Sequence, residues 1–193
     1  MPAAKSDLKI RAAEICDCRR IAELYLVASD GVSEYIWSTI AAPGESLLDV
    51  GQRRYERDNA DISYRNARVV VAGDDVVGML VAYPMVVDPD YEEQDPVLRP
   101  YAILEEPDSY YVAAMAVDEA LRGQGVGSRL LAIAEDDARK AGLDKMSLIV
   151  FDGNTGAKRL YLAKGYKEVN RERIVPNEHI HLDGDALLMV KQL

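Results

Sequence analysis

Residues 115–128 read Met-Ala-Val-Asp-Glu-Ala-Leu-Arg-Gly-Gln-Gly-Val-Gly-Ser, and this stretch decides the fold. Glycines such as Gly123 and Gly125 allow the backbone to turn tightly and to approach a ligand without a clash from a Cβ atom. A helix is expected from about residue 127 to residue 141. It would present its unpaired N–H groups and the positive end of its dipole at this turn. Together these features form a seat for phosphate oxygens.

A dinucleotide site and a plain connecting turn are the alternatives for these glycines. Gly123, Gly125 and Ser128 match only half of the dinucleotide fingerprint G-x-G-x-x-G. Residues 118–122 separate the preceding strand from the first glycine, where the fingerprint expects an immediate turn. The G-x-x-x-x-G-K-S/T pattern of nucleoside triphosphate loops is absent from the turn. The glycines alone leave the plain connecting turn open as an explanation.

Apolar periodicity and turn residues predict a chain that alternates strands with helices. The expected strands cover residues 8–12, 67–72, 76–83, 110–117, 145–151, 167–174 and 185–191. The expected helices are one capped by Asp17 and ended by Asp30-Gly31, a short one capped by Ser33, and others at about 45–59, 127–141 and 155–164. No polar linker separates the halves, so residues 1–193 are expected to form a single domain.

Composition excludes several classes of protein. The net charge of −10 argues against nucleic acid as a partner, since phosphate binding needs clustered Lys and Arg. No apolar run approaches the roughly 20 residues that span a bilayer, so no membrane partner is expected. Residues 1–7 contain no apolar segment typical of a secretory signal. Cys16 and Cys18 are expected to be inert thiols, and the predicted location is the cytoplasm.

Two motifs carry a resemblance to a known family. Arg122-x-x-Gly125-x-Gly127, between a buried strand and an amphipathic helix, is similar to the coenzyme-A-binding motif of the GNAT superfamily of N-acetyltransferases, R/Q-x-x-G-x-G/A. Residues 154–166 resemble the second motif of that family, N-x-x-A-x-x-L-Y-x-K-x-G-F/Y, except that the lysine directly precedes the glycine here. The resemblance implies an α/β fold, a mixed α+β sheet of about seven strands with helices on both faces.

The resemblance also implies acetyl-CoA as the cosubstrate, lying where strand 110–117 splays from strand 145–151. The residues implied to contact it are Met115, Val117, Arg122, Gly123, Gln124, Gly125, Val126, Gly127, Ser128, Asn154 and Tyr161. Backbone groups of Met115 and Val117 would hold the pantetheine arm, and N–H groups of residues 123–128 would hold the pyrophosphate. Arg122 either stabilises the loop or meets a phosphate. Asn154 either caps the following helix or bonds the pantetheine.

The implied reaction is direct attack of an amine on the thioester in a ternary complex. The N–H of Met115 would hold the oxyanion, and such a donor is worth about 3 kcal/mol of barrier. Tyr161 would protonate the departing thiolate, with a core aromatic as its alternative. Histone-acetylating members have a glutamate four residues before the position of Met115. Here that position holds Tyr111, and this departure leaves the general base unassigned.

Candidates for the base precede the strand 110–117 or lie between the last two strands. They are Glu105, Glu106, Asp108, His179 and His181, and each has the alternative of a solvated loop residue. No metal site is expected, because His179 and His181 lack a third ligand placed by the sequence.

The predicted function is therefore that of an N-acetyltransferase that acts on a primary amine of a small molecule or peptide. The alternatives are a non-catalytic acyl-CoA sensor or scaffold and an enzyme that uses a longer acyl-CoA. The excursion, defined as residues 84–108, is predicted to form the acceptor pocket together with the helix of Tyr35–Trp37. The alternative for the excursion is an acidic surface loop or a homodimer contact. That contact would use Val97, Leu98, Tyr101, Ile103 and Leu104.

Overall fold

The computed structural model describes residues 8–193. The strands are β1 (Leu8–Ala12), β2 (Ala67–Ala72), β3 (Asp75–Pro84), β4 (Tyr110–Val117), β5 (Lys145–Phe151), β6 (Lys167–Arg173) and β7 (Asp185–Gln192). The α-helices are α1 (Cys18–Ala28), α2 (Val32–Ile40), α3 (Leu47–Tyr55), α4 (Arg99–Ile103), α5 (Val126–Lys140) and α6 (Thr155–Ala163). Short 3-10 turns are η2 (Ile15–Asp17), η3 (Tyr64–Asn66) and η4 (Glu119–Leu121). Residues 1–7, on which the expectation of no secretory signal rests, lie outside the described residues.

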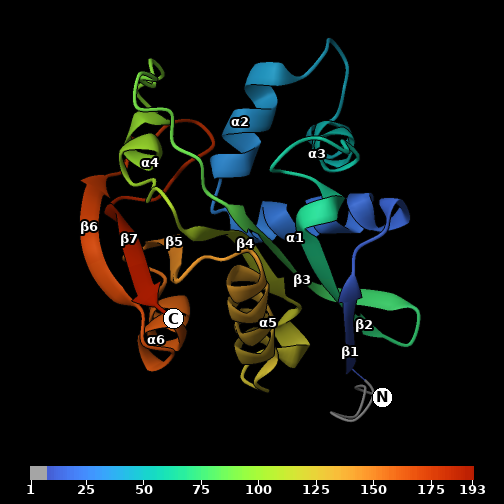
Figure 1. Cartoon of the computed structure of the whole chain (residues 1–193). Coiled ribbons are helices and arrows are strands. Elements are labelled where there is room, and N and C mark those ends of the chain that lie inside the picture. The colour runs from blue at the N-terminus through green and yellow to red at the C-terminus, as the bar shows by residue number, and fades with distance from the viewer. Residues whose placement is uncertain (1–7) are drawn as a thin grey trace. The chain divides into compact units, whose positions relative to one another are not determined.

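The strands form one mixed sheet of seven, in the order β1-β2-β3-β4-β5-β7-β6 (Figure 1). This confirms the expected α/β fold class with a sheet of about seven strands. The chain divides into two compact units, each built from two segments. Unit 1 comprises Met1–Ala82 and Ala114–Leu130, and unit 2 comprises Tyr83–Ala113 and Leu131–Leu193.

The strands of unit 1 begin with an antiparallel meander. β1 pairs with β2 from Leu8 opposite Ala72 to Ala12 opposite Arg68, and β2 pairs with β3 through the predicted hairpin at Gly73. β-Branched residues dominate β2, and Val69 and Val70 are fully buried. The hairpin forms because such residues pack well on a pleated surface and because glycine accepts the positive φ of the turn.

The helical part of unit 1 packs around one tryptophan. Trp37 of α2 is 1% exposed, and its ring lies 6.0 Å from the ring of Tyr25 in α1. The ring of Tyr25 also meets that of Tyr55 in α3 edge-on, at 6.2 Å. Gly51 of α3 faces the tryptophan, and a Cβ atom built at that position would lie 2.2 Å from the indole ring. The absence of a side chain at Gly51 therefore sets how closely α3 approaches Trp37.

Two predicted helix caps are wrong. The side chain of Asp17 does not cap α1; it accepts hydrogen bonds from Arg11 at 2.6 Å and from the N–H of Glu14 at 2.8 Å. Burial raises the pKa of Asp17, but these hydrogen bonds outweigh burial and hold the pKa below its ordinary value. Ser33 lies inside α2, which begins after Gly31 at φ 94°, and its hydroxyl is shared with Ser29 at 2.5 Å. Both side chains thus form hydrogen bonds other than the predicted capping bond to the first N–H groups of the helix.

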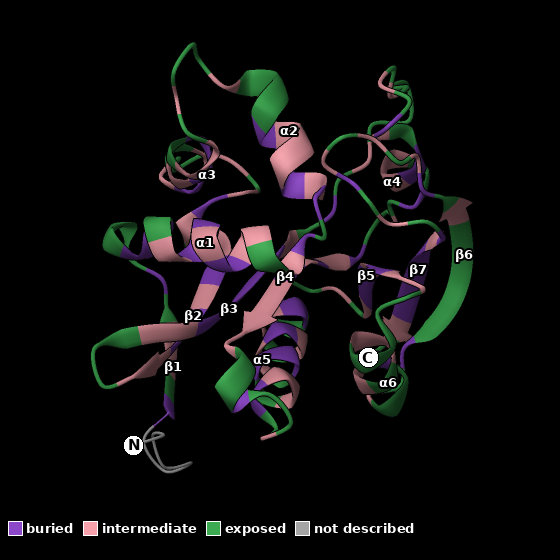
Figure 2. Cartoon of the chain, turned by 180° about the vertical axis from the view of Figure 1, so that it is seen from behind, coloured by how far each residue is buried: buried purple, intermediate pink, exposed green. Residues whose placement is uncertain are grey.

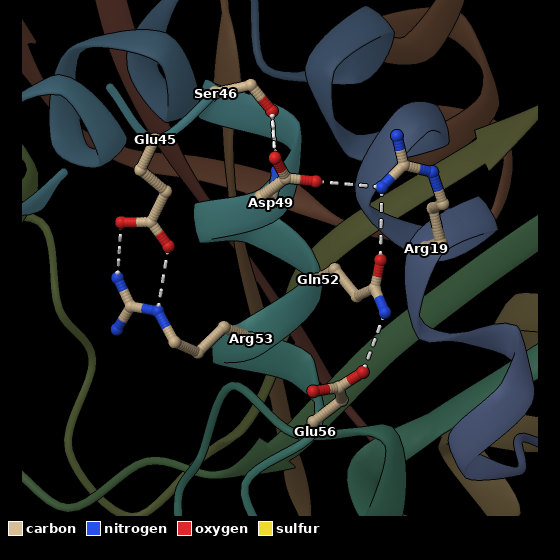
Figure 3. A network of polar contacts seen from close by, with 7 residues as sticks. All are labelled: Arg19, Glu45, Ser46, Asp49, Gln52, Arg53 and Glu56. Carbon is tan, nitrogen blue, oxygen red and sulfur yellow. Dashed lines mark hydrogen bonds and ion pairs between the residues drawn. The ribbon is translucent and has the colours of Figure 1, made fainter. Parts of the chain in front are cut away.

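The exposed side of α3 carries a network of polar contacts (Figure 3). Ser46 caps the helix by accepting from the N–H of Asp49, and Arg19 of α1 donates to Asp49 at 2.9 Å. Arg53 pairs with Glu45, which precedes the helix. The helix is shorter than the predicted 45–59, because it begins after Ser46 and ends at Tyr55.

Unit 2 is built on the strands β5, β7 and β6. β7 lies between the other two and is antiparallel to both. Its residues 186–190 are buried, whereas β6 is exposed along almost its whole length (Figure 2). The start of β4 joins this unit, since Tyr110–Val112 pairs in parallel with residues 146–148 of β5. The buried hydroxyls of Ser109 and Ser147 share a hydrogen bond of 2.6 Å beside this pairing.

The excursion belongs to unit 2 and contains the helix α4. The ring of Tyr101 meets that of Phe151 in β5 edge-on at 6.3 Å, and the side chains of Val97 and Leu104 are buried. The alternative of a dimer contact therefore loses Val97 and Leu104, which pack within their own chain. Ile103 is 48% exposed and stays available to such a contact.

The close approach at Gly51 predicts that Gly51→Ala destabilises the protein. The added methyl group would overlap the Trp37 ring, and overpacking of this kind typically costs about 1–3 kcal/mol. Gly156→Ala in α6 is the matched control, because a Cβ atom there meets only Asn154 Oδ1, at 4.0 Å. The free energy of unfolding in urea should fall for the first variant and stay equal or rise for the second. Equal stability of both variants would contradict the close packing at Gly51.

Candidate functional site

The glycine loop, defined as residues 122–128, connects β4 and η4 to α5. The backbone is left-handed at Gly123, with φ 71°, and at Gly125, with φ 84°. α5 begins at Val126, one residue before the predicted start. Leu121 and Val126 are buried on either side of the turn and anchor it to the core of unit 1. The loop therefore makes the tight turn that the glycines predicted, and its backbone is left-handed at two of them.

The space above the loop is open. A Cβ atom built at Gly123 or Gly125 meets nothing within 4 Å. These glycines are thus required by the positive φ angles and not by neighbouring atoms. The first N–H groups of α5 have no partner within the helix, because the first four donors of any α-helix lack one. Open space, unpaired N–H groups and the positive helix end make a seat for an anion.

Side chains of the loop donate hydrogen bonds to the segment that leads into it. Arg122 Nε donates to the carbonyl of Val117 at 3.1 Å, and Gln124 Nε2 donates to the carbonyl of Ala120 at 3.0 Å. Arg122 thus stabilises the loop, which is one of its two predicted roles. A contact of Arg122 with a phosphate stays a prediction.

The end of β4 lies close to β3 at one position. A Cβ atom at Gly78 would lie 3.0 Å from the carbonyl oxygen of Ala116 and 3.5 Å from Cα of Val117. The glycine therefore leaves room for the backbone of β4 at that point. Sequence reasoning missed Gly78, although a glycine inside a strand pattern is a signal of such an approach. Met115 and Val117 are half-buried, and their bonds to a cofactor stay predictions.

Asn154 is the N-cap of α6. Its side-chain oxygen accepts from the N–H of Ala157 at 3.1 Å. The predicted capping role is thus confirmed. Because its side chain is exposed, Asn154 keeps the capacity for a further contact, and its bond to the pantetheine stays a prediction.

Tyr161 lies on the buried side of α6. Its side chain is 8% exposed, and its ring lies 5.8 Å from that of Tyr166. Burial raises the pKa of Tyr161 to about 12. The hydroxyl is therefore protonated at neutral pH and can donate a hydrogen bond. The reading of Tyr161 as a core aromatic is supported by this packing, and its contact with the departing sulfur stays a prediction.

The candidate bases differ in their surroundings. Glu106 forms an ion pair of 2.5 Å with Lys145, so its carboxylate is already engaged. Desolvation, followed by the charge of Glu93, raises the pKa of Glu105 above its ordinary value, although the residue is exposed. The backbone N–H of His179 is held by the side-chain oxygen of Asn177 at 2.8 Å.

Other kinds of site find little support in the part of the chain that the structure describes. No three His, Cys, Asp or Glu side chains of residues 8–193 lie where they could together hold a metal ion. No helix among these residues combines the length and apolar content needed to cross a membrane. Cys16 and Cys18 are free thiols, and burial raises the pKa of Cys18 to about 12, which makes that thiol unreactive.

Comparisons with known proteins agree on one family. The family model described as "Acetyltransferase (GNAT) family" matches residues 34–166. The acetyltransferase Atu2258 of Agrobacterium fabrum is 41% identical over 59 residues, which cover 31% of this chain and 42% of that protein. The aminoalkylphosphonate N-acetyltransferase of Salmonella typhimurium is 40% identical over 57 residues, which cover 30% of this chain and 37% of that protein. The chain thus spans less than half the length of these curated relatives.

A solved structure resembles almost the whole chain. The Salmonella typhimurium protein yncA, solved with its cofactor acetyl-CoA, gives a TM-score of 0.64 at 21% identity. The match covers 97% of this chain and 94% of that one. At this identity the likeness establishes the fold.

The open glycine loop predicts that Gly125→Val prevents binding of a phosphate-bearing ligand, with coenzyme A as the probe. The valine side chain would fill the space above the loop, and an L-residue at positive φ costs about 1–2 kcal/mol of strain. Gly142→Val is the matched control, since Gly142 has φ 77° and equally open surroundings at the other end of α5. Calorimetry should show binding lost in the first variant alone. Unchanged affinity in a folded Gly125→Val protein would remove the loop from the binding site.

Proposed function

Because this chain belongs to the acetyltransferase (GNAT) family, we propose that it is an N-acetyltransferase. It transfers the acetyl group of acetyl-CoA to a primary amine of a small molecule or peptide. The observation that carries the proposal is the left-handed, open glycine loop at the start of α5, which lies inside the residues that match the family. The name of the Salmonella relative, an N-acetyltransferase of an aminoalkyl compound, supports an amine as the acceptor.

Acetyl-CoA is proposed to bind mainly through backbone groups. The N–H groups of residues 123–128 hold the pyrophosphate, and those of Met115 and Val117 hold the pantetheine arm. Arg122 has Nη groups beyond the Nε that it commits to Val117, and these donate to a phosphate. Backbone donors suit this task because their positions are fixed before the ligand arrives, so no side-chain entropy is lost.

The proposed reaction is a direct transfer. The amine nitrogen attacks the thioester carbon, a C–N bond forms, and the carbonyl electrons move onto oxygen. The N–H of Met115 stabilises this oxyanion by hydrogen bonding. The C–S bond then breaks, and the products are an amide and the coenzyme A thiolate. The nitrogen loses one proton to a base, and the thiolate gains one proton from water.

Tyr161 is proposed to act on the departing sulfur. Its pKa of about 12 lies well above that of a thiol, which is about 8.5. Full proton transfer from this tyrosine to the thiolate is therefore unfavourable by roughly 5 kcal/mol, at 1.36 kcal/mol per pKa unit. A hydrogen bond from the hydroxyl to the sulfur, which strengthens as negative charge develops, avoids this cost.

Glu105 is proposed as the group that takes the proton of the amine. An alkyl ammonium has a pKa near 10, so a base is needed at neutral pH. The raised pKa of Glu105 brings it closer to the working pH than an ordinary carboxylate. Glu106 is engaged by Lys145, which makes it the weaker candidate.

The excursion that carries both residues stays the proposed acceptor side. Trp37 is no part of it, because its side chain is buried against α3.

We further expect a single domain over residues 1–193, a cytoplasmic location, a homodimer, and no nucleic acid partner.

Thiol release from acetyl-CoA tests the proposed function directly. The purified protein is offered polyamines, aminoglycosides, amino acids, aminoalkyl compounds and peptides with free N-termini. Acceptor-dependent release of coenzyme A, with the acetylated amine found by mass spectrometry, is expected for one of these classes. Binding of acetyl-CoA without release in any of them would favour the sensor or scaffold. Release only with longer acyl-CoA donors would favour the other alternative.

Tyr161→Phe is expected to lower kcat more than it weakens coenzyme A binding. A hydrogen bond to a charged group contributes about 1.5–3 kcal/mol, so the loss in kcat should be about tenfold to a hundredfold. Tyr166→Phe is the control, because it removes the hydroxyl of the neighbouring buried tyrosine. Steady-state kinetics with the identified acceptor measures both. An unaltered kcat in Tyr161→Phe would remove its hydroxyl from the mechanism.

A further inference from the structure

Arg20 of α1 makes an unusual number of bonds for a half-exposed arginine. Its Nε donates to the carbonyl of Val76 in β3 at 3.0 Å. Its Nη2 donates to both carboxylate oxygens of Asp118, at 2.8 and 3.1 Å, and its Nη1 donates to Glu23 at 3.1 Å. One guanidinium thus joins a helix, a strand and the residue that follows β4. Only the planar fork of arginine offers donors in these directions at once.

Asp118 is the first residue after β4, where the segment that leads to the glycine loop begins. Its N–H donates to the carbonyl of Val77 at 2.9 Å, next to the carbonyl that Arg20 uses. Asp118 is therefore held to two consecutive carbonyls of β3, one through its backbone and one through Arg20. Its carbonyl in turn accepts from Leu121 at 2.9 Å, which closes η4. The position of Asp118 thus determines where η4 and the glycine loop start.

The carboxylate of Asp118 bonds to Arg20 and does not cap the turn η4 that follows it. An aspartate at the N-cap of a turn commonly accepts hydrogen bonds from the N–H groups that follow. Asp118 occupies the N-cap of η4 but makes no side-chain cap bond. Its two oxygens are committed to Arg20 instead. The carboxylate therefore links the segment that leads into the glycine loop to Arg20 of α1 and, through Arg20, to β3.

The ion pair is a weak contributor to overall stability. The side chains of Arg20 and Asp118 are 38% and 36% exposed, and pairs with such exposure contribute about 0–1 kcal/mol. The pair does, however, hold the backbone at Asp118, four residues before the glycine loop begins at Arg122. A restraint of this kind lowers the cost of ordering the loop when a ligand binds.

We propose that Arg20 is a positioning residue for the phosphate seat. By holding Asp118 in place, it keeps the N–H groups of the glycine loop aimed at the pyrophosphate of the acyl donor. This inference rests on the proposed function, since it needs coenzyme A to bind at residues 123–128. Arg20 itself touches neither the donor nor the acceptor.

A long-range electrostatic effect of Arg20 is the rival explanation. The two explanations predict opposite changes in coenzyme A affinity for Asp118→Ala. If Arg20 acted only as a positive charge near an anion, Asp118→Ala would remove a repulsive charge and raise the affinity for coenzyme A. If Arg20 acts by positioning, Asp118→Ala breaks the same link as Arg20→Ala and lowers the affinity. The double variant should then lose no more affinity than either single variant, because both changes remove one interaction.

The experiment compares the unmodified protein with Arg20→Ala, Asp118→Ala and the double variant, and Arg20→Lys is added as the conservative change. Arg19→Ala is the matched control, since Arg19 is the neighbouring arginine on α1 but bonds to Asp49 and Gln52 of α3 (Figure 3). Calorimetry measures the affinity for coenzyme A and for pantetheine, which lacks the pyrophosphate. Hydrogen exchange measures the protection of the N–H of Asp118. Thermal unfolding verifies that each variant is folded.

Positioning predicts a loss in coenzyme A affinity of about three- to thirtyfold in each of the three variants, a range typical of residues that act through others. Pantetheine affinity should stay unchanged, Asp118 should exchange faster, and Arg20→Lys should be intermediate. The control should bind like the unmodified protein. Higher affinity in Asp118→Ala, equal losses for both ligands, or unchanged affinity in all variants would overturn the inference. Failure of the unmodified protein to bind coenzyme A would instead overturn the proposed function.

Discussion

The left-handed backbone at Gly123 and Gly125 is the constraint on which the candidate site depends. Two such residues so close together turn the chain tightly, so that α5 begins at Val126, shortly after η4 ends at Leu121. The same two positions leave the space above the loop without side chains. Any other residue would introduce both strain and bulk, and the helix end would then lie under a side chain. The same two glycines therefore provide both the left-handed backbone of the loop and the open space above it.

The strands were the most predictable elements. The strands 8–12, 67–72, 110–117 and 145–151 were predicted with the bounds that the structure gives. The last three of these are rich in β-branched or other apolar residues, and each is followed by a glycine or an aspartate, so local pattern and burial agree. Helix starts were less predictable. Asp17 bonds to Arg11 and Ser33 shares its hydroxyl with Ser29, and these partners depend on how the chain folds back on itself.

The candidate site was predictable where its signal is local. The glycine loop and the cap at Asn154 depend on residues a few positions apart, and both were anticipated. The pairs Glu106–Lys145 and Arg20–Asp118 join residues far apart in the chain, and no sequence pattern announces them. A surface charge looks alike in sequence whether it pairs or faces water. The structure was therefore needed to separate an engaged carboxylate from an available one.

The packing of Trp37 against Gly51 has a spectroscopic consequence. The chain contains one tryptophan, and its indole is buried entirely within unit 1. Intrinsic indole fluorescence therefore reports on the helical layer of that unit, whereas far-ultraviolet circular dichroism averages over every helix and strand. Coincident melting curves from the two signals would mean that both units unfold as one cooperative whole, and separated midpoints would mean that they unfold in stages.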